Sequence, residues 1–433
     1  MRPFRYSGGR EVGMASGRGN RRSRKRQRWA ALLVALMIAM LIGAVAVYRL
    51  RSSPKAHRRL DLLYAAWNEF NAKSYDRATA ILDRRAAERE TTPLDWMLRA
   101  RIAESQGRLI EALGHLKHIP DEAPISSQAW LKAGQIELAR HNARGAEAAF
   151  RHSLVLNPDQ IQSYRELAYL YAVQVRREEC DAQYLALSRR IPFDYVLAFA
   201  WCQNYCRLWD PNEARKVLTG FVEFDHDDRV SRLALATNLR LANLLDQAEA
   251  ALGPLPDSDP EARSLRAEVA MDKGEIDAAQ VLVRDGPADH VRLNVIRGRL
   301  ALTTKNAATA ADYFRAALRQ DPEDHDSIAG LGRALRLMGD PQAREFTEAA
   351  LRYESFRRAL QESSTTRHTD RKLFYKLGEH CESVHRPAAA RTWYNLAVIL
   401  DPLDAAARQA LDRLDDAVPT RATAPVLNQE KAI

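Results

Sequence analysis

Cysteine, glycine and aromatic residues are all scarce in this chain. Four cysteines in 433 residues cannot form the dense set of disulfides that stabilises small secreted domains. Nineteen glycines and an aromatic content of 7% are too low for a β-sandwich or barrel, whose turns use glycine and whose strands are rich in aromatic side chains. The hydrophobic fraction of 46% is still large enough to build a core, so the composition favours a folded, helical protein.

Catalytic and cofactor-binding motifs are also missing. No glycine-rich phosphate loop follows a strand pattern, and no Gly-x-Ser-x-Gly nucleophile motif occurs. The cysteines include no Cys-x-x-Cys pair, and the spacing of His380, Cys381 and His385 spreads them around a helix rather than toward one metal. We therefore expect no enzyme activity, no cofactor and no metal site.

Positive charge is concentrated at the N-terminal end. Residues 1–28 contain ten Lys or Arg residues and one acid, and residues 49–59 add five more basic residues. Because the formal net charge of the whole chain is +9, residues 60–433 are mildly acidic. The sequence therefore predicts that the folded part binds no nucleic acid.

Residues 29–48 form a long hydrophobic run, WAALLVALMIAMLIGAVAVY. Twenty residues without a charge span about 30 Å as a helix, which is the thickness of a bilayer core. Trp29 and Tyr48 stand at its ends, where aromatic side chains favour the membrane interface. We therefore predict an N-terminal transmembrane helix. The alternative is a secretory signal cleaved near residues 44–46 (Ala-Val-Ala), with either Met1 or Met14 as the start of the chain.

The flanking charges predict the orientation of this helix. The excess of Lys and Arg on its N-terminal side favours a cytoplasmic N-terminus and places the long C-terminal part outside the cytoplasm. We expect a single-pass protein of the inner membrane, or a secreted protein if the segment is cleaved. Small residues at every fourth position of the run would let two such helices pair into a homodimer. These residues are Ala31, Ala35, Ala39 and Gly43.

A repeat of 34 residues occupies most of the remaining chain. Pro124, Pro158 and Pro192 are separated by 34 residues, and so are Trp130 and Tyr164. Two positions of each unit carry small residues, as expected where two helices pack closely. The eighth position holds Ala66, Ala100, Gly134, Ala168, Cys202, Ala236, Ala267, Gly298, Gly332 and Gly378. The twentieth position holds Ala78, Ala112, Ala146, Cys180, Ala214, Ala248, Ala279, Ala310, Ala343 and Ala390.

This pattern resembles the tetratricopeptide repeat, a helix–turn–helix unit with small residues at positions 8 and 20 and Pro at position 32. The resemblance covers about residues 59–416 and implies an all-α fold, a right-handed superhelical solenoid of about ten units. The units begin near residues 59, 93, 127, 161, 195, 229, 260, 291, 325 and 371, with an insertion at about 352–370 and a capping helix at 404–416. The other predicted segments are a disordered basic tail at 1–28, the transmembrane helix at 29–48, a basic linker at 49–58 and a disordered tail at 417–433.

The resemblance also implies a concave groove built from the first helix of each unit. Positions 5 and 9 of the central units are mainly apolar, aromatic or amide residues, which suit an extended or helical peptide. Some members of the family grip a C-terminal carboxylate with Lys and Asn in the first unit, but Leu63 and Trp67 stand there in this chain. The candidate groove residues are Arg101, Gln135, Arg165, Tyr169, Phe199 and Gln203.

These observations lead to an expected function. We expect a bacterial-type, membrane-anchored scaffold or adaptor that binds a protein or peptide partner in its groove. The alternative is an accessory regulatory or assembly factor of a membrane enzyme, or of a secretion or polysaccharide-export complex, in which one fixed enzyme partner would dominate.

Overall fold

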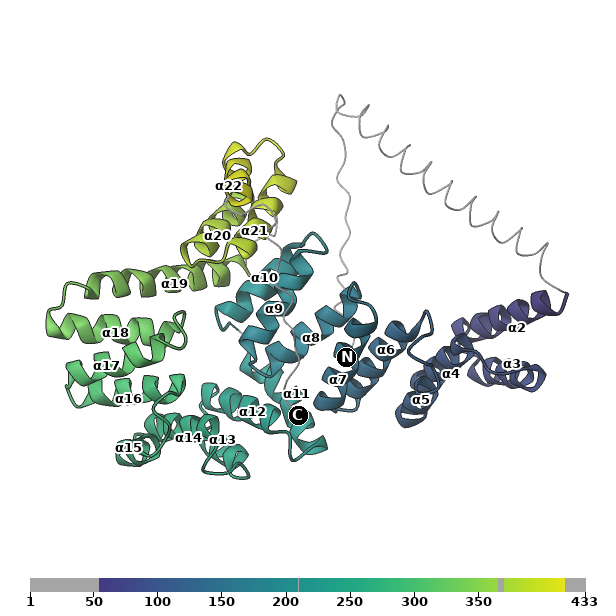
Figure 1. Cartoon of the computed structure of the whole chain (residues 1–433), viewed down its shortest axis with the longest axis horizontal. Helices are drawn as coiled ribbons and strands as arrows, with labels where there is room; N and C mark the ends of the chain where they lie inside the picture. Colours follow the sequence, from purple (N-terminus) through teal and green to yellow (C-terminus); the bar gives the residue numbers. More distant parts are fainter. Residues whose placement is uncertain (1–53, 209, 365–369, 417–433) are drawn as a thin grey trace. The chain divides into compact units, whose positions relative to one another are not determined.

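The computed structural model describes residues 54–208, 210–364 and 370–416 (Figure 1). The predicted transmembrane helix at 29–48 lies outside these residues, as do both predicted tails and the first part of the linker. Within the described ranges, no helix is both long enough and apolar enough to cross a membrane.

The described residues form 21 α-helices and no β-strand, which confirms the all-α prediction. Ten helix pairs follow one another along the chain, and a single helix ends the series. The first three pairs are α2 (Pro54–Asn71) with α3 (Tyr75–Glu88), α4 (Pro93–Ser105) with α5 (Leu109–Leu116), and α6 (Ser126–Ala139) with α7 (Ala143–Leu156). The next four are α8 (Ile161–Val173) with α9 (Arg177–Ser188), α10 (Tyr195–Tyr205) with α11 (Pro211–Phe224), α12 (Arg229–Leu241) with α13 (Leu245–Leu252), and α14 (Pro260–Lys273) with α15 (Ile276–Arg284). The last elements are α16 (Val291–Thr303) with α17 (Ala307–Leu318), α18 (His325–Met338) with α19 (Ala343–Ser363), α20 (Arg371–Ser383) with α21 (Pro387–Leu400), and α22 (Ala405–Asp416).

The turn inside each pair has the same backbone geometry. The first or second residue after the end of the first helix has a positive φ, the left-handed conformation in which glycine is favoured. At the fourth turn, the N–H of Arg176 then donates to the carbonyl of Tyr171 at 2.8 Å, which satisfies a carbonyl at the helix end. Seven of these residues are not glycine, namely Lys73, His141, Val175, Arg207, Asn243, Lys305 and His385, whereas Gly107, Gly274 and Gly339 occupy the other three turns.

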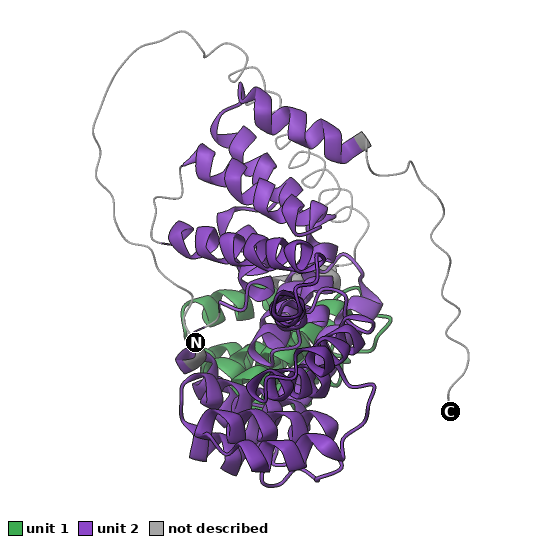
Figure 2. Ribbon diagram, turned by 90° about the vertical axis from the view of Figure 1, so that its left-hand side faces the viewer, with its two compact units in different colours: residues 1–139 green, residues 140–433 purple. Residues whose placement is uncertain are grey.

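The chain divides into two compact units, residues 1–139 and residues 140–433 (Figure 2). The described part of the first unit contains α2 to α6, and α2 to α4 share a core. A buried ion pair joins α3 to α4, because Arg85 Nε donates to Asp95 Oδ1 at 2.5 Å. Asp95 also accepts from the N–H and hydroxyl of Thr92, so the same carboxylate caps the start of α4. The core residues are Leu63, Ala66, Ala78, Leu82, Leu98 and Ile102.

The second unit contains α7 to α22, and its core follows the repeat. The small residues of the eighth and twentieth positions lie between paired helices, as Ala310 and Gly298 do around the buried ring of Phe314. Close helix approach at these points buries large side chains from the same pair, which is the packing that the spacing predicts.

The second unit also closes on itself, since α10 of the fifth pair packs against α19 and α21 of the ninth and tenth pairs (Figure 1). The hydroxyl of Tyr195 donates to the carbonyl of Ser363 at 3.1 Å. The indole N–H of Trp393 donates to Cys202 Sγ at 3.2 Å. We call the contact of α10 with α19 and α21 the closure seam. The 34-residue spacing does not predict it, because it joins segments that are far apart in the sequence.

Part of the predicted insertion at 352–370 builds this seam. Instead of leaving the helix, the chain continues α19 as one helix of 21 residues to Ser363. Tyr353, Phe356 and Leu360 are buried along it at helical spacing, so the added turns present an apolar face. The inserted residues therefore extend the repeat rather than interrupt it.

Candidate functional site

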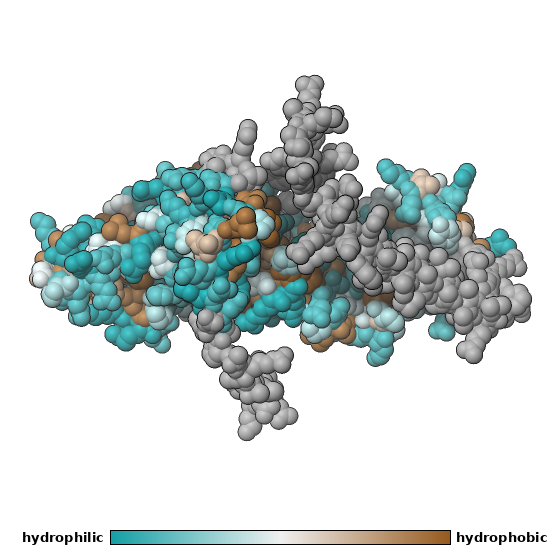
Figure 3. Space-filling view, turned by 90° about the horizontal axis from the view of Figure 1, so that it is seen from above, coloured by the Kyte–Doolittle hydropathy of each residue, from teal (hydrophilic) through white to brown (hydrophobic). Residues whose placement is uncertain are grey.

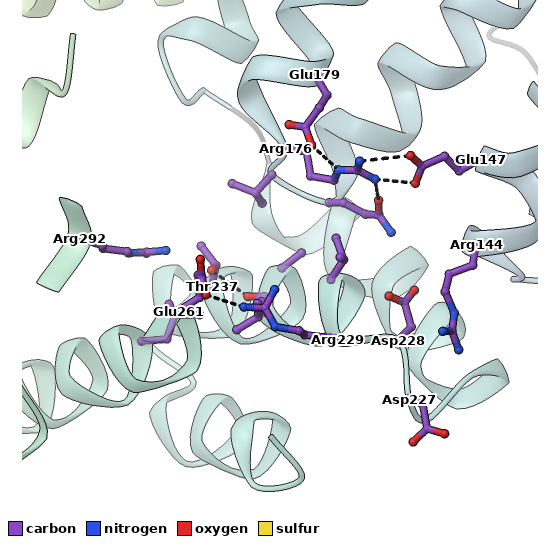
Figure 4. Close-up of a pocket in the computed structure, with 16 residues that line it drawn as sticks. Arg144, Glu147, Arg176, Glu179, Asp227, Asp228, Arg229, Thr237, Glu261 and Arg292 are labelled. Carbon is purple, nitrogen blue, oxygen red and sulfur yellow. Dashed lines mark hydrogen bonds and ion pairs between the residues drawn. The ribbon is translucent and has the colours of Figure 1, made fainter. Parts of the chain in front are cut away.

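Exposed apolar side chains form separate patches on the face drawn in Figure 3, which is otherwise mostly hydrophilic. A candidate site is therefore best found among the cavities. One cavity of about 600 Å³ lies in the second unit (Figure 4). It is bounded by α7, by the turn between α8 and α9, and by the first helices of the sixth, seventh and eighth pairs. Its lining residues are Arg144, Glu147, Gln174, Val175, Arg176, Glu179, Asp227, Asp228, Arg229, Val230, Leu233, Ala234, Thr237, Glu261, Leu265 and Arg292.

The apolar part of the lining comes mainly from α12. Val230, Leu233 and Ala234 belong to this helix, and Leu265 of α14 adds a further apolar side chain. Leu233 and Thr237 occupy positions 5 and 9 of the sixth 34-residue repeat. These are two of the positions expected to line the groove. The hydroxyl of Thr237 donates to the carbonyl of Leu233 at 2.8 Å, which leaves the methyl group of Thr237 as a further apolar element.

Arg176 and Glu147 form the first charged wall of the cavity. The guanidinium of Arg176 donates to both carboxylate oxygens of Glu147, at 2.6 and 3.1 Å, and its Nε donates to Glu179 at 2.9 Å. It also stacks over the ring of Tyr171 at 4.3 Å, and the Tyr171 hydroxyl donates to Glu147 at 3.0 Å. Dashed lines in Figure 4 join Arg176 to Glu147 and to Glu179. Arg176 is therefore fixed in place before any ligand binds.

The same contacts keep Glu147 ionised. Burial acts to raise its pKa, but the hydrogen bonds from Arg176 and the charge of Arg151 outweigh burial and lower the pKa below its ordinary value. A carboxylate held in this way accepts hydrogen bonds and does not serve as a proton donor near neutral pH.

Two further arginines form the opposite wall. Arg229 Nη2 donates to Asp259 at 2.8 Å, and Asp259 in turn caps the first turn of α14. Arg292 donates through Nη2 to Glu268 at 2.9 Å. Glu268 is only 6% exposed and has a lowered pKa, because the charges of Arg292 and Arg240 outweigh the opposing effect of burial. Both arginines are thus held by neighbouring repeats.

Val175 is the most unusual residue of the lining. It adopts a φ of 59°, which is strongly disfavoured for a β-branched side chain, and it is 45% exposed. The other nine turns place Gly, Asn, Lys, Arg or His at this point. Strain of this kind costs about 1–2 kcal/mol, persists where the surrounding structure holds the residue in place, and is frequent at functional sites. This strained and exposed apolar side chain makes the cavity the candidate site.

The lining combines charged and apolar side chains. Four arginines and five carboxylates surround the apolar residues, and the lining includes no His, Cys, Ser or Lys. Paired charges offer both donors and acceptors to a peptide backbone, while the apolar residues accept a side chain. Over the whole described part of the chain, no group of three or more His, Cys, Asp or Glu side chains is placed to hold a metal ion.

Two of the groove residues predicted from the sequence lie in the first compact unit, residues 1–139. Arg101 of α4 places its guanidinium 5.0 Å from the ring centre of Trp67 and 5.3 Å from that of Phe70, so its cation–π contacts are made within the unit. Gln135 is half-buried on α6.

The other four belong to the second unit. Arg165 and Tyr169 are exposed on α8. Phe199 is half-buried on α10 and stacks on Tyr195 at 5.6 Å. The side-chain amide of Gln203 donates to the carbonyl beyond the end of α10, that of Leu208, at 2.9 Å. Phe199 is therefore engaged by a side chain of its own helix and Gln203 by the turn that follows it, and none of the four lines the cavity.

Sequence reasoning missed most of the charged lining. Three of the charged lining residues lie on the first turns of their helices, namely Arg229, Glu261 and Arg292. The equivalent positions of the other repeats do not carry a consistent charge, so the repeat pattern does not single these residues out. A local signal for the α8–α9 turn was present, because a Val stands where the other turns carry Gly or a polar residue.

Comparisons with known proteins find similar solved structures but no matching protein family. No protein-family model and no curated protein matches the sequence. Among solved structures, the chain is similar to the Cut9–Hcn1 hetero-tetramer of the APC/C, at 13% identity over 82% of this chain and 83% of that one, with a TM-score of 0.34. A tetratricopeptide repeat protein from Parabacteroides merdae matches at 17% identity over 56% of this chain and 98% of that one, with a TM-score of 0.31. The human IFIT1 dimer with PPP-AAAA matches at 15% identity over 81% and 79% of the chains, with a TM-score of 0.34. At these low identities and TM-scores the comparisons do not identify a family.

Proposed function

We propose that this chain is a scaffold protein that binds a segment of a partner protein in the cavity between the α8–α9 turn and helices α12, α14 and α16. The observation that carries the proposal is Val175, an exposed β-branched residue with a positive φ in the cavity wall. A glycine or a residue that is not β-branched would reduce this strain, so we attribute a contact with the bound segment to the Val175 side chain.

The lining indicates the chemistry of the bound segment. Val175, Val230, Leu233 and Leu265 offer an apolar surface for one or two aliphatic side chains. All four guanidinium groups and three of the five carboxylates around them are already in ion pairs, so the lining favours the neutral polar groups of a peptide backbone over a strongly charged ligand. The segment is therefore an apolar stretch of polypeptide, bound in an extended or helical form.

The proposal also includes a membrane anchor at residues 29–48. Residues 29–48 hold the scaffold in the inner membrane, with the N-terminus in the cytoplasm and the helical array outside it. The supports for this are the uncharged length of the run and the excess of basic residues before it.

Crosslinking in membranes tests the binding proposal. The full chain with an affinity tag is crosslinked in its host, and the captured proteins are quantified by mass spectrometry. Leu233→Glu places an unpaired charge on the apolar wall and should reduce recovery of the partner at least about tenfold. Val281→Glu is the matched control, because Val281 is 51% exposed on α15 and does not line the cavity. Equal recovery with both variants, at unchanged expression, would place the binding surface elsewhere.

A further inference from the structure

Two cysteines meet at the closure seam. Cys202 of α10 and Cys381 of α20 are 179 positions apart in the sequence, yet their Sγ atoms lie 3.7 Å apart. Both side chains are buried, and the indole N–H of Trp393 on α21 donates to Cys202 Sγ at 3.2 Å. The fold therefore places one thiol of the fifth pair against one thiol of the tenth pair.

The other two cysteines are placed differently. Cys180 Sγ donates to the carbonyl of Ala168 at 3.3 Å, which is a contact within the fourth pair. Cys206 directly follows α10, one helical turn after Cys202. Cβ atoms four positions apart on a helix are about 5–6 Å from each other, whereas a disulfide needs about 3.5–4.5 Å. Cys202 and Cys381 are thus the pair that the fold favours.

A disulfide bond between these two residues needs only a small movement. All four cysteines are free in the structure. The sulfurs of a disulfide are about 2.05 Å apart, so the Sγ atoms of Cys202 and Cys381 have to approach each other by about 1.7 Å. Disulfides persist outside the cytoplasm, which is the proposed location of the helical array.

Burial determines when such a bond can form. The attacking species in thiol–disulfide exchange is the thiolate, not the thiol. Burial raises the pKa of the Cys381 thiol, so this group does not ionise readily inside the closed seam. The bond therefore forms while the array folds, before the seam excludes the oxidant, and it is then protected from reductants by the same burial.

We infer that Cys202 and Cys381 become joined by a disulfide bond that links the two sides of the closure seam covalently. The inference rests on the proposed function, because it requires the array to lie outside the cytoplasm. The oxidant is a disulfide, carried by a protein or by glutathione. One cysteine thiolate attacks it, forms a mixed disulfide and releases one thiol. The other cysteine then attacks the mixed disulfide and releases the second thiol, so two electrons and two protons pass from the cysteines to the oxidant.

Refolding of the full chain in detergent tests which cysteines pair. The chain is reduced, unfolded in urea and refolded with a mixture of reduced and oxidised glutathione, and peptide mapping by mass spectrometry identifies the linked residues. The expected product links Cys202 to Cys381. Pairing without guidance from the fold would instead favour Cys180 with Cys202 or Cys206, because short loops close more readily. Any other dominant pair, or four free thiols, would overturn the inference.

Melting temperatures test whether the bond stabilises the seam. The oxidised wild type should melt about 5 °C higher than the same chain after reduction, because the bond closes a loop of 179 residues. Cys202→Ala should lose this gain, whereas Cys180→Ala should keep it. The two variants are matched, since each replaces a buried cysteine at a position where other repeats carry Ala. Equal melting temperatures for the oxidised and reduced wild type would overturn the inference.

The chain isolated from its host separates this inference from the proposed location. Thiols are trapped with acid and then alkylated, and a C-terminal alkaline phosphatase fusion, which is active only outside the cytoplasm, reports the location. A link between Cys202 and Cys381 in this sample supports the inference. Free thiols together with an active fusion would overturn it. Free thiols together with an inactive fusion would overturn the proposed location, and the inference with it.

Discussion

The ring of Phe314 occupies the space beside Gly298, where a Cβ atom would lie 2.7 Å from the ring Cζ. Gly298 is on α16 and Phe314 is on α17, so the contact joins the two helices of the eighth pair. Gly330 of α18 meets the same ring from the next pair. The two glycines let three consecutive helices close around one aromatic side chain that has no exposed surface.

Gly298→Ala should therefore destabilise the protein. A methyl group would overlap the Phe314 ring, and displacing a packed ring costs about 1–3 kcal/mol. Gly114→Ala on α5 is the control, because a Cβ there would meet nothing within 4 Å, and Ala favours the helix by about 0.5–1 kcal/mol. Urea denaturation followed by circular dichroism should give a lower midpoint for the first variant only. A midpoint that stays the same for Gly298→Ala would contradict the packing around Phe314.

Val175→Gly should stabilise the fold and weaken partner binding. The change removes the strain of a β-branched residue at a positive φ, which is worth about 1 kcal/mol after the added chain entropy is subtracted. Lys305→Gly, at a φ of 60° in the eighth pair, should give a smaller gain, because Lys is not β-branched, and should have no effect on binding. Melting temperatures and the crosslinking yield of the partner measure the two effects. Full binding by Val175→Gly would mean that the side chain has no role in recognition.

Stability should fall in acid through Glu147. Its folded-state pKa lies below the ordinary value, so its contribution is complete above the unfolded-state pKa and is lost as the pH falls toward the folded-state pKa. Glu147→Gln should cost about 1–3 kcal/mol at neutral pH, and the difference from wild type should shrink as the pH drops. The exposed Glu223→Gln is the control. A difference that is constant across pH would contradict the ionised Arg176–Glu147 pair.

Arg386→Ala should loosen the closure seam. The variant loses the ion pairs with Asp181 and Glu323 and the cation–π contact with Tyr205, which together are worth about 2 kcal/mol. Arg391→Ala breaks an exposed pair with Asp415 and should cost less than about 1 kcal/mol. Hydrogen exchange should speed up in α20 and α21 for Arg386→Ala only. Unchanged protection there would show that the seam does not depend on this residue.

The predicted topology is tested by a C-terminal fusion to alkaline phosphatase, an enzyme that is active only outside the cytoplasm. The excess of basic residues before residues 29–48 favours an active fusion. Deleting residues 29–48 should abolish the activity. An inactive phosphatase fusion, together with a fluorescent cytoplasmic reporter at the same point, would reverse the predicted orientation.

Local sequence was sufficient to predict the helix pairs. Gly298 and Ala310 stand at the eighth and twentieth positions, and the structure places both against Phe314. The prediction succeeds because the two helices of a pair are joined by a short turn, so their contacts depend on residues less than one repeat apart. The groove residues were harder to predict, because a side chain at position 9 can line a cavity, as that of Thr237 does, or bond to a neighbour in its own repeat, as that of Gln203 does.

The sequence by itself determined the helical class, the small-residue contacts within each pair and the hydrophobic run at 29–48. Only the tertiary structure decided that α19 continues through the expected insertion, that α10 meets α19 and α21, and that Cys202 lies against Cys381. The physical reason is that small rotations between successive repeats add up along the array. The residues that meet across the seam are therefore set by the sum of many packing angles, which no local pattern records.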